Sequence, residues 1–170
     1  MRPGPSKWIA GTAVFFCITL LCGRTHGATL SVKDGSYASE TFTSEPAFVV
    51  ENEYYRAIVV PGKGGRILSL VDKTTGKTIV TERGYGGLLD DHGDRYTKPY
   101  AAKWTRQTPS EASIEMTLDG ALSYRKTVTF FADRPVIQVD YAIANATQEP
   151  QRMLFRNVVR PGGGTFGDEE

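Results

Sequence analysis

Residues 113–131 read Ser-Ile-Glu-Met-Thr-Leu-Asp-Gly-Ala-Leu-Ser-Tyr-Arg-Lys-Thr-Val-Thr-Phe-Phe, and this stretch decides the fold. Its first part alternates apolar and polar residues, with Ile114 and Met116 in the apolar series, which is typical of a strand with one buried face. Asp119-Gly120 is a tight hairpin signal. Residues 122–131 are rich in β-branched and aromatic side chains. The stretch therefore predicts two antiparallel strands joined by a hairpin.

The same pattern continues on both sides of this hairpin. Downstream, four apolar residues alternate with other residues, namely Ile137, Val139, Tyr141 and Ile143. Upstream, residues 54–60 and 66–71 flank Pro61-Gly62-Lys63-Gly64-Gly65, a composition that predicts a turn. No sustained 3.6-residue apolar period follows Ala28. Short strands between turn signals predict an all-β protein, an antiparallel β-sandwich.

The N-terminus has the three regions of an export signal. Arg2 and Lys7 form a basic head, the apolar run 8–22 follows, and small residues such as Gly27 close the segment. The run is 15 residues long, shorter than the roughly 20 that cross a bilayer as a helix. We therefore expect residues 1–27 to be a signal peptide, and the protein to be secreted or periplasmic with no stable membrane span after cleavage.

Removal of this segment changes the charge and the thiol content of the chain. Three of the 20 basic residues, Arg2, Lys7 and Arg24, lie in it, which leaves 17 basic against 19 acidic residues. Such a nearly neutral chain offers no basic face for nucleic acid. Cys17 and Cys22 are the only cysteines, so the exported chain is expected to form no disulfide. Residues 28–161 are expected to form one sandwich domain.

Two further segments are expected to be irregular. Residues 84–99 form a polar, glycine-punctuated stretch, which predicts a functional loop. Residues 162–170 carry three glycines and an acidic end with little apolar content, so they are expected to be a flexible tail or a truncated continuation.

Several of these strands resemble galactose mutarotase-like domains, the large carbohydrate-binding β-sandwiches of aldose 1-epimerases that are also attached to glycoside hydrolases and lyases. The resemblance is carried by residues 51–61, 64–70 and 72–77, and then by 124–130 and 134–141. It covers roughly residues 47–161 and corresponds to the N-terminal portion of the family's sandwich. Because that sandwich has roughly twice as many strands, the resemblance implies unpaired strands that an additional domain or self-association would cover.

The resemblance also suggests where a sugar would be handled. The family's epimerases use two histidines and a late carboxylate, because opening a pyranose needs a base at the anomeric oxygen and an acid at the ring oxygen. His92 stands where the first histidine is expected. Residues 155–160 contain no second histidine, and the chain carries no matching late carboxylate. The catalytic residues are therefore unknown, and binding without turnover is the leading interpretation.

The candidate substrate-binding residues come from the polar loop and from two places nearby in the expected fold. They are Asp90, Asp91, His92, Arg95, Tyr96, Trp104, Arg156 and Asn157. An aromatic ring suits the C–H groups of a pyranose, and a guanidinium suits hydroxyls or carboxylates. Each also has a structural interpretation: His92 as an exposed loop residue, Trp104 as a core residue and Arg156 as a strand surface residue. The acidic loop matches no calcium-binding spacing, so no metal and no cofactor are expected.

Three functions are compatible with these patterns. The first is a secreted carbohydrate-binding domain of a glycan-processing system. The second is a sugar mutarotase, glycoside hydrolase or lyase whose catalytic residues lie beyond this chain. The third is a structural β-sheet module.

Overall fold

The computed structural model describes residues 8–17, 28–80, 87–91, 97–153 and 155–159. Its strands are β1 (Trp8–Cys17), β2 (Ser31–Tyr37), β3 (Glu45–Glu51), β4 (Tyr55–Val60), β5 (Arg66–Asp72), β6 (Thr78–Val80), β7 (Leu88–Asp91), β8 (Ala101–Gln107), β9 (Glu111–Leu118), β10 (Leu122–Phe131), β11 (Val136–Asn145) and β12 (Arg156–Val159). These residues include no α-helix, and Pro61–Lys63 form a 3₁₀-helix, η1. Among them there is accordingly no helix of the length and apolarity that a membrane crossing requires.

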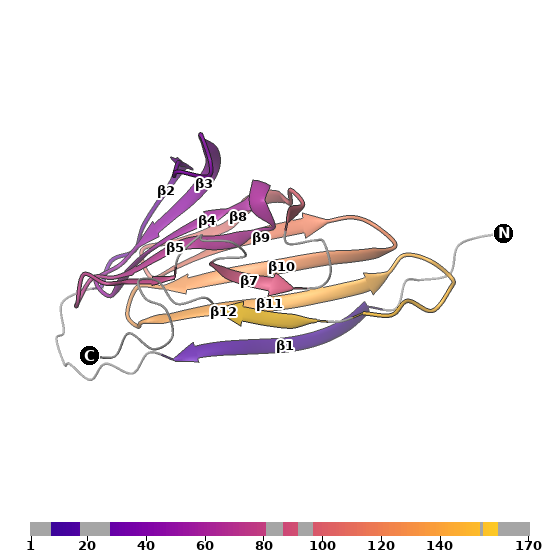
Figure 1. The fold of residues 1–170 in the computed structure, drawn as a ribbon. Coiled ribbons are helices and arrows are strands. Elements are labelled where there is room, and N and C mark those ends of the chain that lie inside the picture. Colours follow the sequence, from indigo (N-terminus) through magenta and orange to yellow (C-terminus); the bar gives the residue numbers. More distant parts are fainter. Residues whose placement is uncertain (1–7, 18–27, 81–86, 92–96, 154, 160–170) are drawn as a thin grey trace, which may run out of the picture.

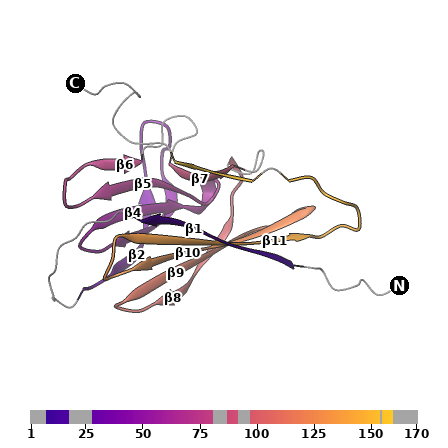
Figure 2. The ribbon, with the colours of Figure 1, turned by 90° about the horizontal axis from the view of Figure 1, so that it is seen from below.

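The strands form two antiparallel sheets packed face to face (Figures 1 and 2). One sheet has the order β1-β11-β10-β9-β8. The other has the order β12-β7-β5-β4-β3-β2, with β6 paired to β5. The protein is therefore an all-β antiparallel sandwich, as its sequence predicts.

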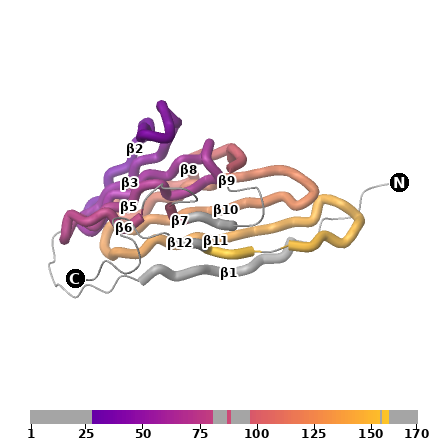
Figure 3. The backbone as a smooth tube through the Cα atoms, in the orientation of Figure 1, coloured from indigo at the N-terminus to yellow at the C-terminus, as the bar shows by residue number. Residues whose placement is uncertain are grey.

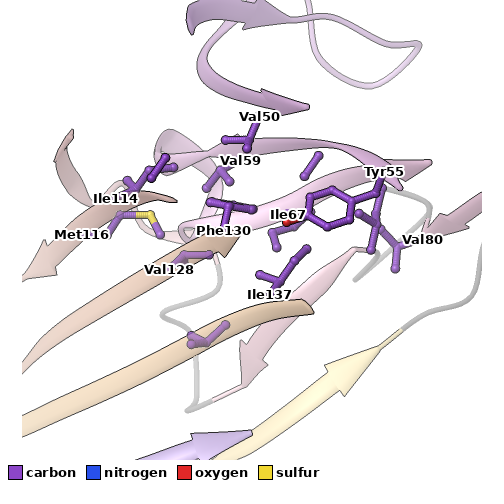
Figure 4. Packing of buried hydrophobic residues seen from close by; sticks show 14 of the residues in the cluster. Val50, Tyr55, Val59, Ile67, Val80, Ile114, Met116, Val128, Phe130 and Ile137 are labelled. Atoms are coloured by element: carbon purple, nitrogen blue, oxygen red, sulfur yellow. The ribbon is translucent and has the colours of Figure 1, made fainter. Parts of the chain in front are cut away.

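The meander of β9, β10 and β11 confirms the facing that the alternation predicts. The hairpin at Asp119-Gly120 joins β9 to β10, with Tyr124 opposite Leu118 and Val128 opposite Ile114. In β11, Ile137 and Val139 are buried whereas Gln138 is half-exposed. Close-packed side chains from both sheets fill the space between the layers (Figure 4), among them Val50, Tyr55, Val59, Ile67 and Val80 from one sheet and Ile114, Met116, Val128, Phe130 and Ile137 from the other.

Asn52, in the turn between β3 and β4, ties the two sheets together. Asn52 is only 3% exposed, so its side-chain amide needs hydrogen-bond partners within the protein. The side-chain oxygen accepts hydrogen bonds from the backbone N–H groups of Tyr54 and Tyr55, both at 2.8 Å. The side-chain nitrogen donates to the carbonyl of Phe131 in β10, also at 2.8 Å. One side chain therefore closes a turn and bridges the layers.

One part of the predicted loop 84–99 is a strand, which corrects the expectation for that part. Leu88–Asp91 form β7, which pairs with β12 and meets β5 at the Ile67–Leu88 pair. Gly87 allows this approach because its φ is +93° and a Cβ there would lie 2.5 Å from the carbonyl oxygen of Ile67. The alternation that marks other strands is absent from Leu-Leu-Asp-Asp, so the pattern does not identify this one.

The segment expected to be a signal contains β1, whose backbone pairs antiparallel along β11 from Trp8 opposite Ala144 to Cys17 opposite Val136. Figures 1 and 3 show the path of the chain, in which β12 belongs to the other sheet and contacts β11 through Tyr141 and Asn157. Cleavage of residues 1–27 stays a prediction. Residues 162–170, expected to be a flexible tail, lie outside the described residues.

Candidate functional site

A groove of about 740 Å³ opens between β8 of one sheet and the β2–β3 edge of the other. We call it the Trp104 groove. Its lining is mostly apolar, with a few polar groups, as is usual for small-molecule sites. The lining residues are Asp34, Gly35, Pro46, Ala47, Phe48, Pro61, Gly62, Tyr100, Ala102, Lys103 and Trp104.

Trp104 is held in one orientation by contacts from the opposite sheet. It lies in β8, half-buried, and its ring meets that of Phe48 edge to face at 4.8 Å and 77°. Its indole Nε1 donates a hydrogen bond of 2.9 Å to Asp34 Oδ1 in β2. An indole has one N–H donor, and this hydrogen bond uses it. Trp104 packs against the core and also lines the groove, and its role in sugar binding stays a prediction.

The Pro61–Gly65 turn and Tyr100 form a rigid part of the groove. The Tyr100 N–H donates to the Pro61 carbonyl at 3.0 Å, and the Gly64 N–H donates to the Lys98 carbonyl at 2.9 Å. Beneath them Lys126, only 3% exposed, donates from Nζ to the Gly65 carbonyl at 2.6 Å. The same ammonium lies 5.5 Å from the centre of the Tyr100 ring, within range of a cation–π contact.

Ion pairs surround the groove and satisfy its neighbouring cations. Lys63 Nζ lies 2.8 Å from Glu45 Oε1, and Lys103 Nζ lies 3.2 Å from Glu115 Oε1. Asp34, in contrast, has no lysine or arginine within 4.0 Å among the described residues. It is therefore an exposed carboxylate whose one protein partner in that part of the chain is the indole of Trp104.

The predicted site residues fall into two separate places. Backbone pairing of β7 with β12 sets Asp91 opposite Arg156 and Asp90 opposite Asn157. Asn157 is exposed and accepts a 3.1 Å hydrogen bond from Tyr141 in β11. These four predicted residues therefore come together at the β12 edge. His92, Arg95 and Tyr96 lie outside the described residues.

Trp104 does not join that group, which corrects the expectation of one site built from the loop, Trp104 and Arg156. β8 is the outermost strand of its sheet, with β9 and β10 between it and β11, over which β12 lies. Neighbouring strands are about 4.8 Å apart, so the two places are separated by roughly 14 Å across the sheet. Sequence reasoning does not reveal this because the strand order is set by pairing between distant segments.

Most of the residues around Trp104 are absent from the sequence-based candidates. Asp34 and Phe48 belong to β2 and β3, and nothing in their local sequence signals a site. Tyr100 and Pro61 are brought together by the backbone bond described above. The only local signal is the Pro-Gly-Lys-Gly-Gly turn, which by itself indicates no more than a connection between strands.

A second hollow, of about 460 Å³, is lined by Ala28, Thr29, Ser31, Glu51, Asn52, Glu53 and Lys73. Its polar groups bind one another. Lys73 Nζ donates to Glu51 Oε1 at 2.7 Å and to the Asn52 carbonyl at 2.8 Å. The hydrogen bond from Lys73 is the main reason that the pKa of Glu51 lies below its ordinary value. These hydrogen bonds hold the β3–β4 turn, so the polar groups of this hollow have a structural role.

Among the described side chains, no three His, Cys, Asp or Glu residues gather in a way that would hold a metal ion.

The chain matches no protein-family model and no curated protein. Its fold is similar to part of a TPR-domain containing protein from Parabacteroides distasonis ATCC 8503, a crystal structure, with a TM-score of 0.51 and 14% sequence identity. The match covers 69% of this chain and 30% of that chain, so the chain spans less than a third of its structural neighbour. At this identity the likeness concerns the fold alone.

Proposed function

We propose that this protein is an exported carbohydrate-binding β-sandwich of a glycan-processing system, and that it binds sugar in the Trp104 groove. The observation that carries the proposal is the fixed indole of Trp104 in a groove of about 740 Å³, with the Asp34 carboxylate bonded to it. The volume lies within the range of roughly 300–1,000 Å³ that is typical of small-molecule sites.

The chemistry of the lining suits a pyranose. Sugar rings present C–H groups on their faces and hydroxyl groups around their edges. An aromatic ring packs well against the C–H face, and a nearby carboxylate accepts hydrogen bonds from the hydroxyls. Trp104 and Asp34 supply this pair, and their mutual bond means that little ordering is needed when a ligand arrives.

Two properties of the sequence support the same proposal. The resemblance of residues 47–161 to galactose mutarotase-like domains points to carbohydrate as the ligand class. The predicted export signal at residues 1–27 would bring the protein to the compartment where extracellular glycans are met.

Glycan-array binding of the full chain, followed by titration calorimetry of each hit, tests the proposal. We expect binding to neutral oligosaccharides and a loss of at least tenfold in affinity for Trp104→Leu. Phe131→Leu is the matched control, because Phe131 is a half-buried aromatic residue that stacks on Arg134 away from the groove. Equal affinity of the two variants, or an array without hits from folded protein, would refute the proposal.

Polarimetry separates binding from turnover. With fresh α-glucose or α-galactose, we expect mutarotation at the buffer rate, because the chain has no second histidine in residues 155–160 to complete an acid–base pair. Acceleration that His92→Ala abolishes would establish a mutarotase instead.

A further inference from the structure

Asp34 is the one carboxylate among the lining residues of the Trp104 groove. Lys103 in the lining pairs with Glu115, and Lys63, next to Gly62 of the lining, pairs with Glu45. Lys33 precedes Asp34 in β2, but successive side chains of a strand point to opposite faces. The described residues thus place an uncompensated negative charge at the point where the indole of Trp104 is anchored.

A carboxylate only accepts hydrogen bonds, and it has about four acceptor positions. Trp104 Nε1 uses one position on Oδ1, and the described residues occupy none of the others, so on their side Oδ2 and the remaining positions are open to a ligand. Hydroxyl and ammonium groups can donate to them, and such charge-assisted bonds are stronger than neutral ones. A ligand carboxylate at the same place would have no hydrogen to donate to Asp34 and would instead meet a like charge, in competition with water around this exposed side chain.

We infer that Asp34 makes the groove select neutral and amino sugars and exclude uronic acids. This inference rests on the proposed function, since it assigns the sugar class to the same site. The shared chemistry of the accepted ligands is an O–H or N–H donor directed at Asp34, next to a C–H face on Trp104.

Titration calorimetry on the full chain with three oligosaccharides of matched length tests the inference: a cello-oligosaccharide, a deacetylated chitosan oligosaccharide and an oligogalacturonate. The wild type should bind the cello-oligosaccharide, the chitosan oligosaccharide or both at least tenfold more tightly than the oligogalacturonate. Affinity that falls steeply with added salt would identify an ammonium donor, and affinity that is nearly constant would identify hydroxyl donors.

The test variant is Asp34→Asn, which keeps the side-chain shape and an oxygen that can accept from Trp104. We expect about tenfold weaker binding of the preferred sugar and a reduced penalty for the oligogalacturonate. Asp133→Asn is the matched control, because it removes one carboxylate with 71% exposure in the β10–β11 turn. Asp133→Asn should change neither the affinity for the preferred sugar nor that for the oligogalacturonate. Thermal melts of both variants should match the wild type.

The outcomes separate the inference from the proposed function. Tight oligogalacturonate binding that requires Trp104 but is unchanged in Asp34→Asn would overturn the inference and leave carbohydrate binding intact. Failure of all three oligosaccharides to bind, together with an array without hits, would overturn both.

Discussion

The indole nitrogen of Trp104 donates a hydrogen bond of 2.9 Å to Asp34, and the two residues belong to different sheets 70 positions apart in sequence. The bond closes the β8–β2 side of the sandwich and sets the orientation of the aromatic wall of the groove. We therefore expect Asp34→Ala to loosen Trp104 as well as to remove an acceptor.

That expectation has a spectroscopic readout. In a Trp8→Phe background, Trp104 is the only tryptophan of the chain. Adding Asp34→Ala should increase the quenching of its fluorescence by acrylamide, because the ring gains freedom and exposure. Asp133→Ala in the same background should leave quenching unchanged. Identical quenching of the two variants would show that Asp34 does not hold the indole.

The facing of β11 predicts the largest simple packing effect. Ile137 is 8% exposed and packs in the central cluster, whereas Gln138 is half-exposed and bonds to Asp140. Ile137→Ala should lower the free energy of unfolding by about 2–4 kcal/mol through lost burial and a cavity. Gln138→Ala should cost less than about 1 kcal/mol. Denaturant melts measure both, and equal costs would mean that the strand faces the other way.

Much of this architecture can be predicted from the sequence because a strand with one buried face has a local pattern of alternating apolar and polar residues. The alternation around Ile114 and Ile137 predicts both the strands and their buried faces, and Asp119-Gly120 predicts their hairpin. Gly87 and the short strand β7 that follows it show no such alternation, since their conformation depends on the carbonyl of Ile67 across the sheet. Whether a stretch is loop or strand is decided there by a tertiary contact.

The Trp104 groove could not be predicted from local sequence patterns for the same reason. Trp104 is a candidate on its own chemistry, but its partner Asp34 lies in a distant strand whose pairing the local pattern does not specify. Grouping Arg156 with Trp104 requires both to lie on one concave face. The strand order instead puts β8 and β12 on opposite sides of the sandwich, and strand order is a property of long-range pairing.

Gly87 should tolerate no side chain. Alanine there would meet the Ile67 carbonyl oxygen at 2.5 Å in addition to adopting a positive φ. Gly76 is the control, because its φ is +70° but a Cβ added there would have no atom within 4 Å. Both variants bear the left-handed backbone cost of about 1–2 kcal/mol. Gly87→Ala should cost roughly 1–3 kcal/mol more in thermal or denaturant melts. Equal costs would contradict the close approach of β7 to β5.

Asn52 should be among the most sensitive polar positions. Asn52→Ala leaves two backbone N–H groups and the Phe131 carbonyl without their bonds, so we expect a loss of about 3 kcal/mol in unfolding free energy. Asn145→Ala is the comparison, because Asn145 also makes turn hydrogen bonds but in an exposed setting. Its cost should stay near about 1 kcal/mol. A smaller loss at Asn52 than at Asn145 would remove the role of Asn52 as the link between sheets.

Acid should weaken the β5–β6 turn. The side-chain hydrogen bond from Thr75 is the main reason that the pKa of Asp72 lies below its ordinary value of 3.8, and bonds to Thr74 add to it. A lowered carboxyl pKa stabilises the folded state above the unfolded-state pKa, and this contribution is lost as the pH falls through the folded-state pKa. Asp72→Asn should therefore be less stable than wild type near pH 6, and the gap should shrink below about pH 4. A gap independent of pH would rule out this contribution.

The most direct test of carbohydrate binding in the Trp104 groove is a ¹H–¹⁵N NMR titration of the full chain with a neutral oligosaccharide, following the indole N–H resonance of Trp104. That proton points at Asp34, so a sugar that bonds to the same carboxylate must perturb it. The predicted result is a saturable shift of this resonance, accompanied by shifts of Gly62 and Lys103 in the groove lining. In Asp34→Asn the same shift should require about tenfold more ligand. Binding that leaves the indole resonance unmoved while shifting Arg156 and Asn157 would place the sugar at the β12 edge and contradict the site.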